Sequence, residues 1–324
     1  MKELQAVILA GGRGKRLHPI TLNHSKAMTP ILGVPIIQRV IKSLEKNGIK
    51  RFVLVRAPDD YELENLAKKL KEENHLEIKL AVQPEAKGSA HALACARELI
   101  DSDFILASCD NLYPDEHFQK IIRCFFETKA CAVFTLSKIK PGDLNRSAGV
   151  KLKENEIIEI KEKPGENSGK WDAISKFLFV LSKRILDFLA LVEESERGER
   201  EIQSAIRLLI EDQKPHQKPM GIFVSNYLHL TSAKDLIEIH KHYLSNHKPY
   251  SIHPQAKLED KIEIVEPVMI EKDVVIKSGA RIGPFVYIGQ GACLEEKVSL
   301  EEVVVYPNVK ITSGTQKSYQ VLID

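Results

Sequence analysis

The sequence has few cysteines and no closely spaced pair of them. Its 324 residues include five, Cys95, Cys109, Cys124, Cys131 and Cys293, and no C-x-x-C motif. An odd, dispersed set argues against a disulfide framework and against a zinc site built from thiolates. It predicts reduced thiols in a cytoplasmic protein.

Long apolar runs and a strong charge of either sign are also missing. No run approaches the roughly 18 residues of a membrane-spanning helix. The apolar stretch at 6–10 is shorter than a signal-peptide core and leads into glycines. A net charge of +2 favours neither nucleic acid nor an anionic membrane surface as a partner. The composition therefore predicts a soluble intracellular protein.

The chain does contain a regular alternation of apolar runs and amphipathic stretches. Strands are predicted at 5–10, 52–55, 78–82, 104–107 and 132–136, and helices at 35–47, 60–74, 88–100 and 114–128. This alternation predicts an α/β protein with a doubly wound sheet that is mixed but mostly parallel. Residues 149–182 break the rhythm with three strand-like pieces, at 149–152, 157–161 and 176–181. Helices are predicted again at 183–195, 199–212 and 232–245.

From Ala256 the sequence has a period of six. Small aliphatic residues recur every six positions as far as Val304, and a larger apolar residue follows each two positions later, from Leu258 to Tyr306. One inward-facing residue on each short flat face predicts a triangular solenoid, a left-handed parallel β-helix of hexapeptide repeats.

The repeat also predicts how the chain is divided. We expect one domain at 1–250 and a short β-helix at 251–324, which Lys310 and Thr312 close as a polar cap. A β-helix this short buries little core by itself, so we expect it to mediate self-association. His240 and His242, two residues apart on a predicted helix, are expected at the surface rather than in a metal site.

A glycine-rich turn follows the first predicted strand, in the segment from Leu9 to Leu17. Glycines allow backbone N–H groups to approach phosphate oxygens, and Lys15 and Arg16 add positive charge. The segment is not a P-loop, which needs glycine in place of Leu9 and serine or threonine in place of Arg16. Taken alone, the turn also fits a tight bend with solvated basic neighbours.

The turn belongs to a longer stretch, Ala10-Gly-Gly-Arg-Gly-Lys-Arg-Leu-His-Pro-Ile-Thr21 and then Lys26-Ala-Met-Thr-Pro-Ile-Leu-Gly-Val-Pro-Ile36. This stretch resembles the signature of sugar-1-phosphate nucleotidylyltransferases, which include glucose-1-phosphate thymidylyltransferases and UDP-sugar pyrophosphorylases. The resemblance implies the nucleotide-diphospho-sugar transferase fold, with Arg16 on the triphosphate and Lys26 on the reacting phosphates. The nucleotide contacts it implies in the turn are Leu9, Ala10, Gly11, Gly12, Gly14 and Lys15.

Residues 83–93 resemble the base- and sugar-reading loop of the same family. The resemblance implies nucleotide contacts at Gln83, Gly88 and Ser89, and a glutamine in this place goes with uridine or thymidine nucleotides. UTP or dTTP is therefore the expected nucleotide, and the sugar is left open.

Later segments resemble the metal and sugar-phosphate contacts of the family. Residues 108–113 resemble its strand-end Gly-Asp-Asn, in which the aspartate, here Asp110, binds Mg²⁺. A carboxylate just past a parallel strand is also where an α/β site usually places one. Gly149, Glu162 and Lys163 resemble the contacts to the sugar 1-phosphate.

Five positions depart from the family pattern. Lys15 stands where threonine is usual, Ser25 replaces a proline, and Ser175 begins the stretch in place of the usual Asn-x-Gly. Ile206 and His229 each replace an aspartate, and the second of these aspartates is a metal ligand in the family. An imidazole at His229 should weaken Mg²⁺ and favour Mn²⁺. A solvated or core histidine before a helix explains His229 equally well.

Three functions follow from these observations. The first is an enzyme that joins a nucleoside triphosphate to a sugar 1-phosphate with Mg²⁺, or Mn²⁺, as cofactor. The second is a non-catalytic nucleotide-binding or sugar-phosphate-binding regulatory subunit of the same fold, which the five departures favour. The third is a bifunctional enzyme with acyl transfer in the β-helix, and the absence of histidine from 256–324 argues against it.

Overall fold

The computed structural model describes residues 4–195, 198–212, 217–246 and 250–323. The chain forms two compact units, the first of residues 1–13, 24–28 and 37–227, and the second of 14–23, 29–36 and 228–324. This grouping follows contacts within the folded chain, and the division near residue 250 stays a prediction. Among the described residues, no helix has both the length and the apolar character needed to cross a bilayer.

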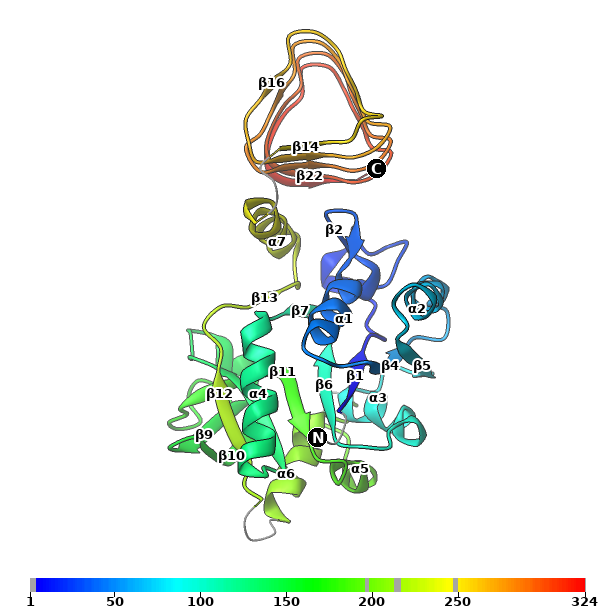
Figure 1. Ribbon diagram of the computed structural model, residues 1–324. Helices are drawn as coiled ribbons and strands as arrows, with labels where there is room; N and C mark the ends of the chain where they lie inside the picture. Colours follow the sequence, from blue (N-terminus) through cyan, green and yellow to red (C-terminus); the bar gives the residue numbers. More distant parts are fainter. Residues whose placement is uncertain (1–3, 196–197, 213–216, 247–249, 324) are drawn as a thin grey trace. The chain divides into compact units, whose positions relative to one another are not determined.

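The first unit is built on a nine-stranded mixed sheet (Figure 1). In spatial order the strands are β5 (Glu77–Val82), β4 (Arg51–Arg56), β1 (Gln5–Leu9), β6 (Phe104–Ser108), β11 (Ala173–Leu181), β8 (Ala132–Ser137), β12 (Met220–Phe223), β10 (Glu156–Lys161) and β9 (Gly149–Lys153). The first four are mutually parallel, and β11 is antiparallel to both β6 and β8. The α/β class and the mixed sheet expected from the sequence are confirmed. The sheet is not mostly parallel, because β10 pairs antiparallel with β9 and β12, and β11 pairs antiparallel with each of its neighbours.

Helices of the expected kind connect these strands. They are α1 (Ile36–Lys46), α2 (Tyr61–Asn74), α3 (Ser89–Cys95), α4 (Asp115–Thr128), α5 (Ile185–Phe188) and α6 (Ile202–Glu211). The helix expected at 183–195 is wrong in extent, because α5 gives way to the short 3-10 helix η5 (Leu189–Leu191) and the backbone becomes extended at Val192. The helix expected at 88–100 likewise ends at Cys95, and the 3-10 helix η3 (Arg97–Leu99) follows.

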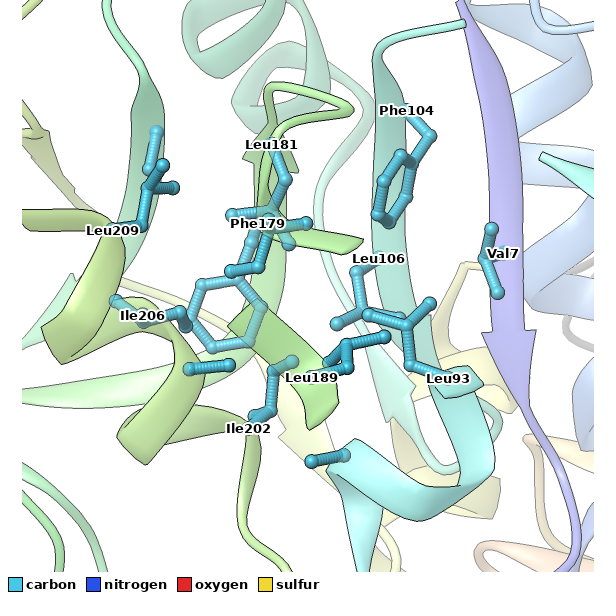
Figure 2. Close-up of a cluster of buried hydrophobic side chains, with 14 of the residues drawn as sticks. Val7, Leu93, Phe104, Leu106, Phe179, Leu181, Leu189, Ile202, Ile206 and Leu209 are labelled. Carbon is cyan, nitrogen blue, oxygen red and sulfur yellow. The ribbon is translucent and has the colours of Figure 1, made fainter. Parts of the chain in front are cut away.

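One face of the sheet carries a large apolar core. Figure 2 shows Val7, Leu106 and Phe179 from three neighbouring strands facing side chains of α3, η5 and α6. The adjacent residues Ala6 and Ile8 are also fully buried, on the opposite face, because side chains alternate along a strand. Burial on both faces explains why these strands read as continuous apolar runs.

The second unit contains a coil of short parallel strands, drawn as stacked triangles in Figure 1. The strands are β14 (Tyr250–Ile252), β15 (Lys257–Leu258), β16 (Glu263–Ile264), β17 (Val268–Ile270), β18 (Val275–Ile276), β19 (Arg281–Ile282), β20 (Val286–Ile288), β21 (Cys293–Leu294), β22 (Ser299–Val305), β23 (Lys310–Ile311) and β24 (Gln316–Leu322). Paired residues such as Val275 and Cys293 are three hexads apart, as one turn of a triangular coil requires.

The hexad phase slips by one residue near the end of the coil. Val303 and Val305 lie in its core, whereas Val304, expected to face inward, lies in a separate cluster with Tyr287. The expectation for Val304 is therefore wrong, and the slip follows Glu302, whose backbone is left-handed (φ 52°). The cap expected at Lys310 and Thr312 is also wrong, because Ile311 between them is buried in the core and β24 follows.

The second unit also contains α7 (Ala233–Ser245) and the hairpin of β2 (Pro30–Ile31) and β3 (Val34–Pro35). The expectation that His240 is a surface residue is wrong, because this side chain is 1% exposed. Its Nε2 accepts a hydrogen bond from Leu32 N at 3.2 Å, and its Nδ1 lies 2.8 Å from Leu236 O. Partners for both nitrogens explain how the ring is buried. His242 is exposed, as expected.

Candidate nucleotide site

The glycine turn begins where β1 ends beside β6. Leu9 O accepts a hydrogen bond from Cys109 N at 3.2 Å, and Ala10 N donates to Val55 O at 2.8 Å, so both residues are held by the sheet. Gly11 and Gly12 come next, and in the described part of the chain neither amide donates to a protein acceptor. These amides at a strand end are the donors that a phosphate-binding turn requires.

Two charged residues from distant parts of the chain meet beside this turn. Lys26 starts the 3-10 helix η2 (Lys26–Met28), and its amide donates to Gly12 O at 3.3 Å. Its Nζ forms an ion pair with Asp110, which lies 84 residues away in the sequence and just past the end of β6. The side chains are only 12% and 13% exposed. The structure thus brings together Lys26, which the resemblance places on the reacting phosphates, and Asp110, which it makes a Mg²⁺ ligand.

Asp110 has the chemistry of a cation ligand. Asn111 Nδ2 donates to Asp110 Oδ1 at 3.3 Å and to Ser108 Oγ at 2.6 Å, which orients the strand end. The described residues include no group of three or more histidine, cysteine or carboxylate side chains able to hold a metal by themselves. A lone carboxylate fits a cation such as Mg²⁺, which completes its coordination with water and phosphate oxygens.

The buried phenol of Tyr113 lies near Asp110. Its ring stacks on Tyr227 with centroids 5.8 Å apart, and its buried hydroxyl has no hydrogen-bond partner among the described residues. Burial and then the negative charge of Asp110 raise the pKa of Tyr113, so the phenol stays neutral. Burial likewise raises the pKa of Cys109 to about 12, which excludes a thiolate next to Asp110.

The proposed base-reading loop is anchored by its own side chains. Gln83, 8% exposed, donates from Nε2 to Gly88 O at 3.1 Å, and the same nitrogen lies 3.2 Å from His91 Nδ1. A Cβ on Gly11 would lie 3.0 Å from Gln83 Oε1, so the glutamine packs directly on the glycine turn. Two segments expected to bind the same nucleotide are therefore adjacent.

Gly88 and Ser89 also have partners within the protein. Gly88 has a left-handed backbone (φ +92°), and a Cβ there would lie 2.5 Å from Arg200 O, so only glycine fits. Ser89 Oγ accepts from Ile202 N at 2.9 Å and donates to Glu201 Oε2 at 3.3 Å. These bonds join the loop to the start of α6 and account for both residues without a ligand.

Of the three proposed sugar-phosphate residues, one is constrained by packing and the other two form an ion pair. A Cβ on Gly149 would lie 2.7 Å from Trp171 Cδ2, so the glycine makes room for the indole. Glu162 and Lys163 are paired with each other at 3.6 Å, and Lys163 has a left-handed backbone (φ 42°). The structure gives Gly149 a packing role that the sequence did not reveal.

The remaining predicted residues belong to the second unit. Gly14 precedes the 3-10 helix η1 (Lys15–Leu17), in which Lys15 and Arg16 are exposed. His229 lies in β13 (Leu228–His229) and is exposed, with Thr231 Oγ1 at 3.3 Å from its ring nitrogens. Within this unit each is accessible to a ligand.

Comparison with known proteins identifies the family. Residues 5–246 match the family model described as Nucleotidyl transferase. The chain belongs to the nucleotidyl transferase family. The bifunctional protein GlmU of Methanocaldococcus jannaschii is 30% identical over 278 residues, which are 86% of this chain and 61% of that protein. The present chain thus spans about three fifths of this relative.

A further curated protein and a solved structure are also similar to this chain. The UTP–glucose-1-phosphate uridylyltransferase AglF of Haloferax volcanii is 32% identical over 209 residues, covering 64% of this chain and 84% of AglF. A solved UDP-glucose pyrophosphorylase complexed with UDP-glucose superposes with a TM-score of 0.64 at 19% identity, covering 76% of this chain and all (100%) of that one. At that identity the likeness shows the fold alone.

The family assignment puts the departures in a structural context. Ile206, where the family resemblance expects an aspartate, is fully buried in the core between α6 and the sheet. Ser175 lies on β11 with a buried hydroxyl that has no partner among the described residues. The family resemblance did not assign His91, although it lies within the loop quoted for it and contacts Gln83.

Proposed function

We propose that this nucleotidyl transferase joins a nucleoside triphosphate, UTP or dTTP by preference, to a sugar 1-phosphate. The products are the nucleoside-diphosphate sugar and pyrophosphate. The observation that carries the proposal is the ion pair of Lys26 with Asp110 beside the backbone amides of Gly11 and Gly12. Neither amide donates a hydrogen bond to an acceptor among the described residues. A cation, an anion and free amide donors at one strand end suit a metal-bound triphosphate.

In the proposed reaction an oxygen of the sugar phosphate attacks the α-phosphorus of the triphosphate, and pyrophosphate leaves. Such a displacement depends on alignment and on charge neutralisation more than on an acid or base. Lys26 neutralises the reacting phosphates, and Lys163 holds the sugar phosphate. Mg²⁺ held by Asp110 would supply further positive charge. For Arg16 on the triphosphate and His229 on a metal, the proposal rests on the family resemblance alone.

We also propose that the coil is left-handed and that it mediates self-association. Its stacked parallel strands and its period of six residues support the first point. Light scattering of the full chain tests the second, which a monomeric mass would contradict.

Pyrophosphate release tests the enzyme directly. The purified chain is incubated with each of UTP, dTTP, CTP, ATP and GTP, in combination with a panel of sugar 1-phosphates and Mg²⁺ or Mn²⁺. Release that requires both substrates supports the enzyme, with UTP or dTTP the fastest. A chain that no pair turns over contradicts it.

The second candidate is a nucleotide-binding subunit without turnover. The observation in its favour is Ile206, an apolar core residue in place of an aspartate. A ligand that binds only the native state raises the melting temperature whether or not it reacts. Stabilisation by UTP without pyrophosphate release would therefore select this candidate over the enzyme.

A further inference from the structure

The carboxamide of Gln83 is held by two partners from its own loop. Its Nε2 donates to Gly88 O at 3.1 Å and lies 3.2 Å from His91 Nδ1. The side chain is almost fully buried, so these bonds are shielded from water. The loop therefore fixes the direction in which the amide points.

The chemistry of the partners fixes which end of the amide is the nitrogen. A backbone carbonyl can only accept, so Gly88 O must face the NH₂ group of Gln83. His91 Nδ1 then faces an N–H group and must be the acceptor, which leaves the ring proton on Nε2. Cys95 Sγ lies 3.9 Å from that Nε2 and can accept a weak hydrogen bond from it. Burial raises the pKa of Cys95, so the sulfur is a neutral thiol.

The remaining polar atom of Gln83 is Oε1, which faces the glycine turn. A Cβ on Gly11 would come within 3.0 Å of it. With both NH₂ protons engaged by Gly88 and His91, the amide offers a ligand only a hydrogen-bond acceptor. Uracil and thymine carry an N3–H donor, whereas cytosine has an unprotonated N3 that would face Oε1 with repulsion between lone pairs.

We propose that His91 is a positioning residue that makes the base site select uracil or thymine over cytosine. It does so by accepting a hydrogen bond from the second N–H of the Gln83 amide, which keeps Oε1 facing the base. When His91 cannot accept, the amide loses one of its two anchors. Turning its NH₂ group toward cytosine N3 then breaks one hydrogen bond, to Gly88 O, instead of two. This inference rests on the proposed nucleotide site and explains its base preference.

The test compares His91→Leu, which has no acceptor, with His91→Gln, whose side-chain oxygen can accept. The exposed His242→Leu is the matched control for loss of a histidine. For each protein, kcat/KM is measured with UTP and CTP, and the rise in melting temperature is measured with each nucleotide in the absence of sugar phosphate.

We expect the UTP-to-CTP ratio of kcat/KM to fall about five- to tenfold in His91→Leu, as loss of one hydrogen bond would predict. The ratio should return to within about twofold of wild type in His91→Gln and stay unchanged in His242→Leu. The stabilisation by UTP relative to CTP should follow the same order. If His91 had only a structural role, its loss would lower kcat/KM equally for both nucleotides and leave the ratio unchanged.

The outcomes separate this inference from the proposed function. An unchanged ratio in His91→Leu, or equal ratios in His91→Leu and His91→Gln, overturns the role of His91 while the nucleotide site stands. If UTP neither reacts with nor stabilises the wild-type chain, both proposals fail. His91→Phe, which also lacks an acceptor, replaces His91→Leu if the latter melts early without ligand.

Discussion

The base side and the acceptor side of the candidate site are held by different forces. On the base side, Gln83, Gly88 and His91 fix one another through hydrogen bonds, and the loop is joined to α6 through Ser89. On the acceptor side, Gly149 is determined by the indole of Trp171. Two of the five departures from the family pattern, Ser175 and His229, stand where the resemblance places contacts to the sugar and to the metal.

This difference indicates what each side of the site can change. Directional bonds specify one arrangement of donors and acceptors, so the base side should keep a narrow preference. Apolar packing specifies shape and tolerates exchange of polar groups in the space around it. The nucleotide is therefore easier to infer than the sugar, and four substitutions examine the contrast.

The largest effect is expected for Asp110→Asn, because Asp110 is the residue proposed to hold the metal at the reacting phosphates. Loss of the carboxylate should lower kcat by about 100-fold or more, near 2.7 kcal/mol of barrier. It should also lower the melting temperature, because Lys26 loses its partner in a largely buried ion pair. Asp115→Asn, on α4 outside the site, is the control. A mutant that keeps more than about a tenth of wild-type kcat, a change of only about 1.4 kcal/mol, shows that Asp110 is not a metal ligand.

Gly149→Ala should act on folding rather than on the nucleotide. The new Cβ would lie 2.7 Å from Trp171 and 3.0 Å from Pro164, so the indole must move. Overpacking of this kind costs about 1–3 kcal/mol of unfolding free energy, measurable by urea titration. In Gly12→Ala, where a Cβ meets nothing within 4 Å, the midpoint should not move. Equal midpoints for the two variants would remove the packing role of Gly149.

Gly11→Ala examines the base side. Its Cβ would lie 3.0 Å from Gln83 Oε1, so the carboxamide must shift by about a few tenths of an ångström and stability should change little. Recognition of the base should weaken, with kcat/KM for UTP about tenfold lower, equivalent to about 1.4 kcal/mol. Steady-state kinetics at fixed sugar phosphate provides the measurement. If kcat/KM for UTP is unaffected, Gln83 does not contact the base.

The smallest effect is expected for His229→Asp. If the imidazole is a metal ligand, nitrogen favours Mn²⁺ over Mg²⁺, so the wild-type activity ratio of Mn²⁺ to Mg²⁺ should be high. The aspartate should raise activity with Mg²⁺ and lower the ratio of Mn²⁺ to Mg²⁺ activity by about threefold, because a carboxylate oxygen suits Mg²⁺ better than an imidazole nitrogen does. If the rate and the ratio both stay as they were, His229 takes no part in metal binding.

Much of the fold could be predicted because short segments of the sequence show which residues are buried. Continuous apolar runs indicated β1, β4, β5, β6 and β8, and the six-residue period indicated the coil. The local pattern did not indicate β12, which has four residues, nor the slip in hexad phase after Glu302. Both depend on pairing with strands elsewhere in the chain, which periodicity does not encode.

The candidate site shows the same division. The family resemblance pointed to Lys26, Gln83 and Asp110, and the place of Asp110 just past a parallel strand agrees with it. The same reasoning left His91 unassigned, because nothing in its spacing from Gln83 says that the loop turns back to join them.

The sequence by itself determined the α/β class, the repeat and the chemical groups available to a nucleotide. Only the tertiary structure decided that β11 enters the sheet between β6 and β8, that Trp171 requires Gly149, and that His91 faces Gln83. Local sequence sets the polarity and backbone preference of each segment. The partner of a strand or of a buried amide is chosen by the free energy of the whole folded chain, to which residues far apart in sequence contribute together.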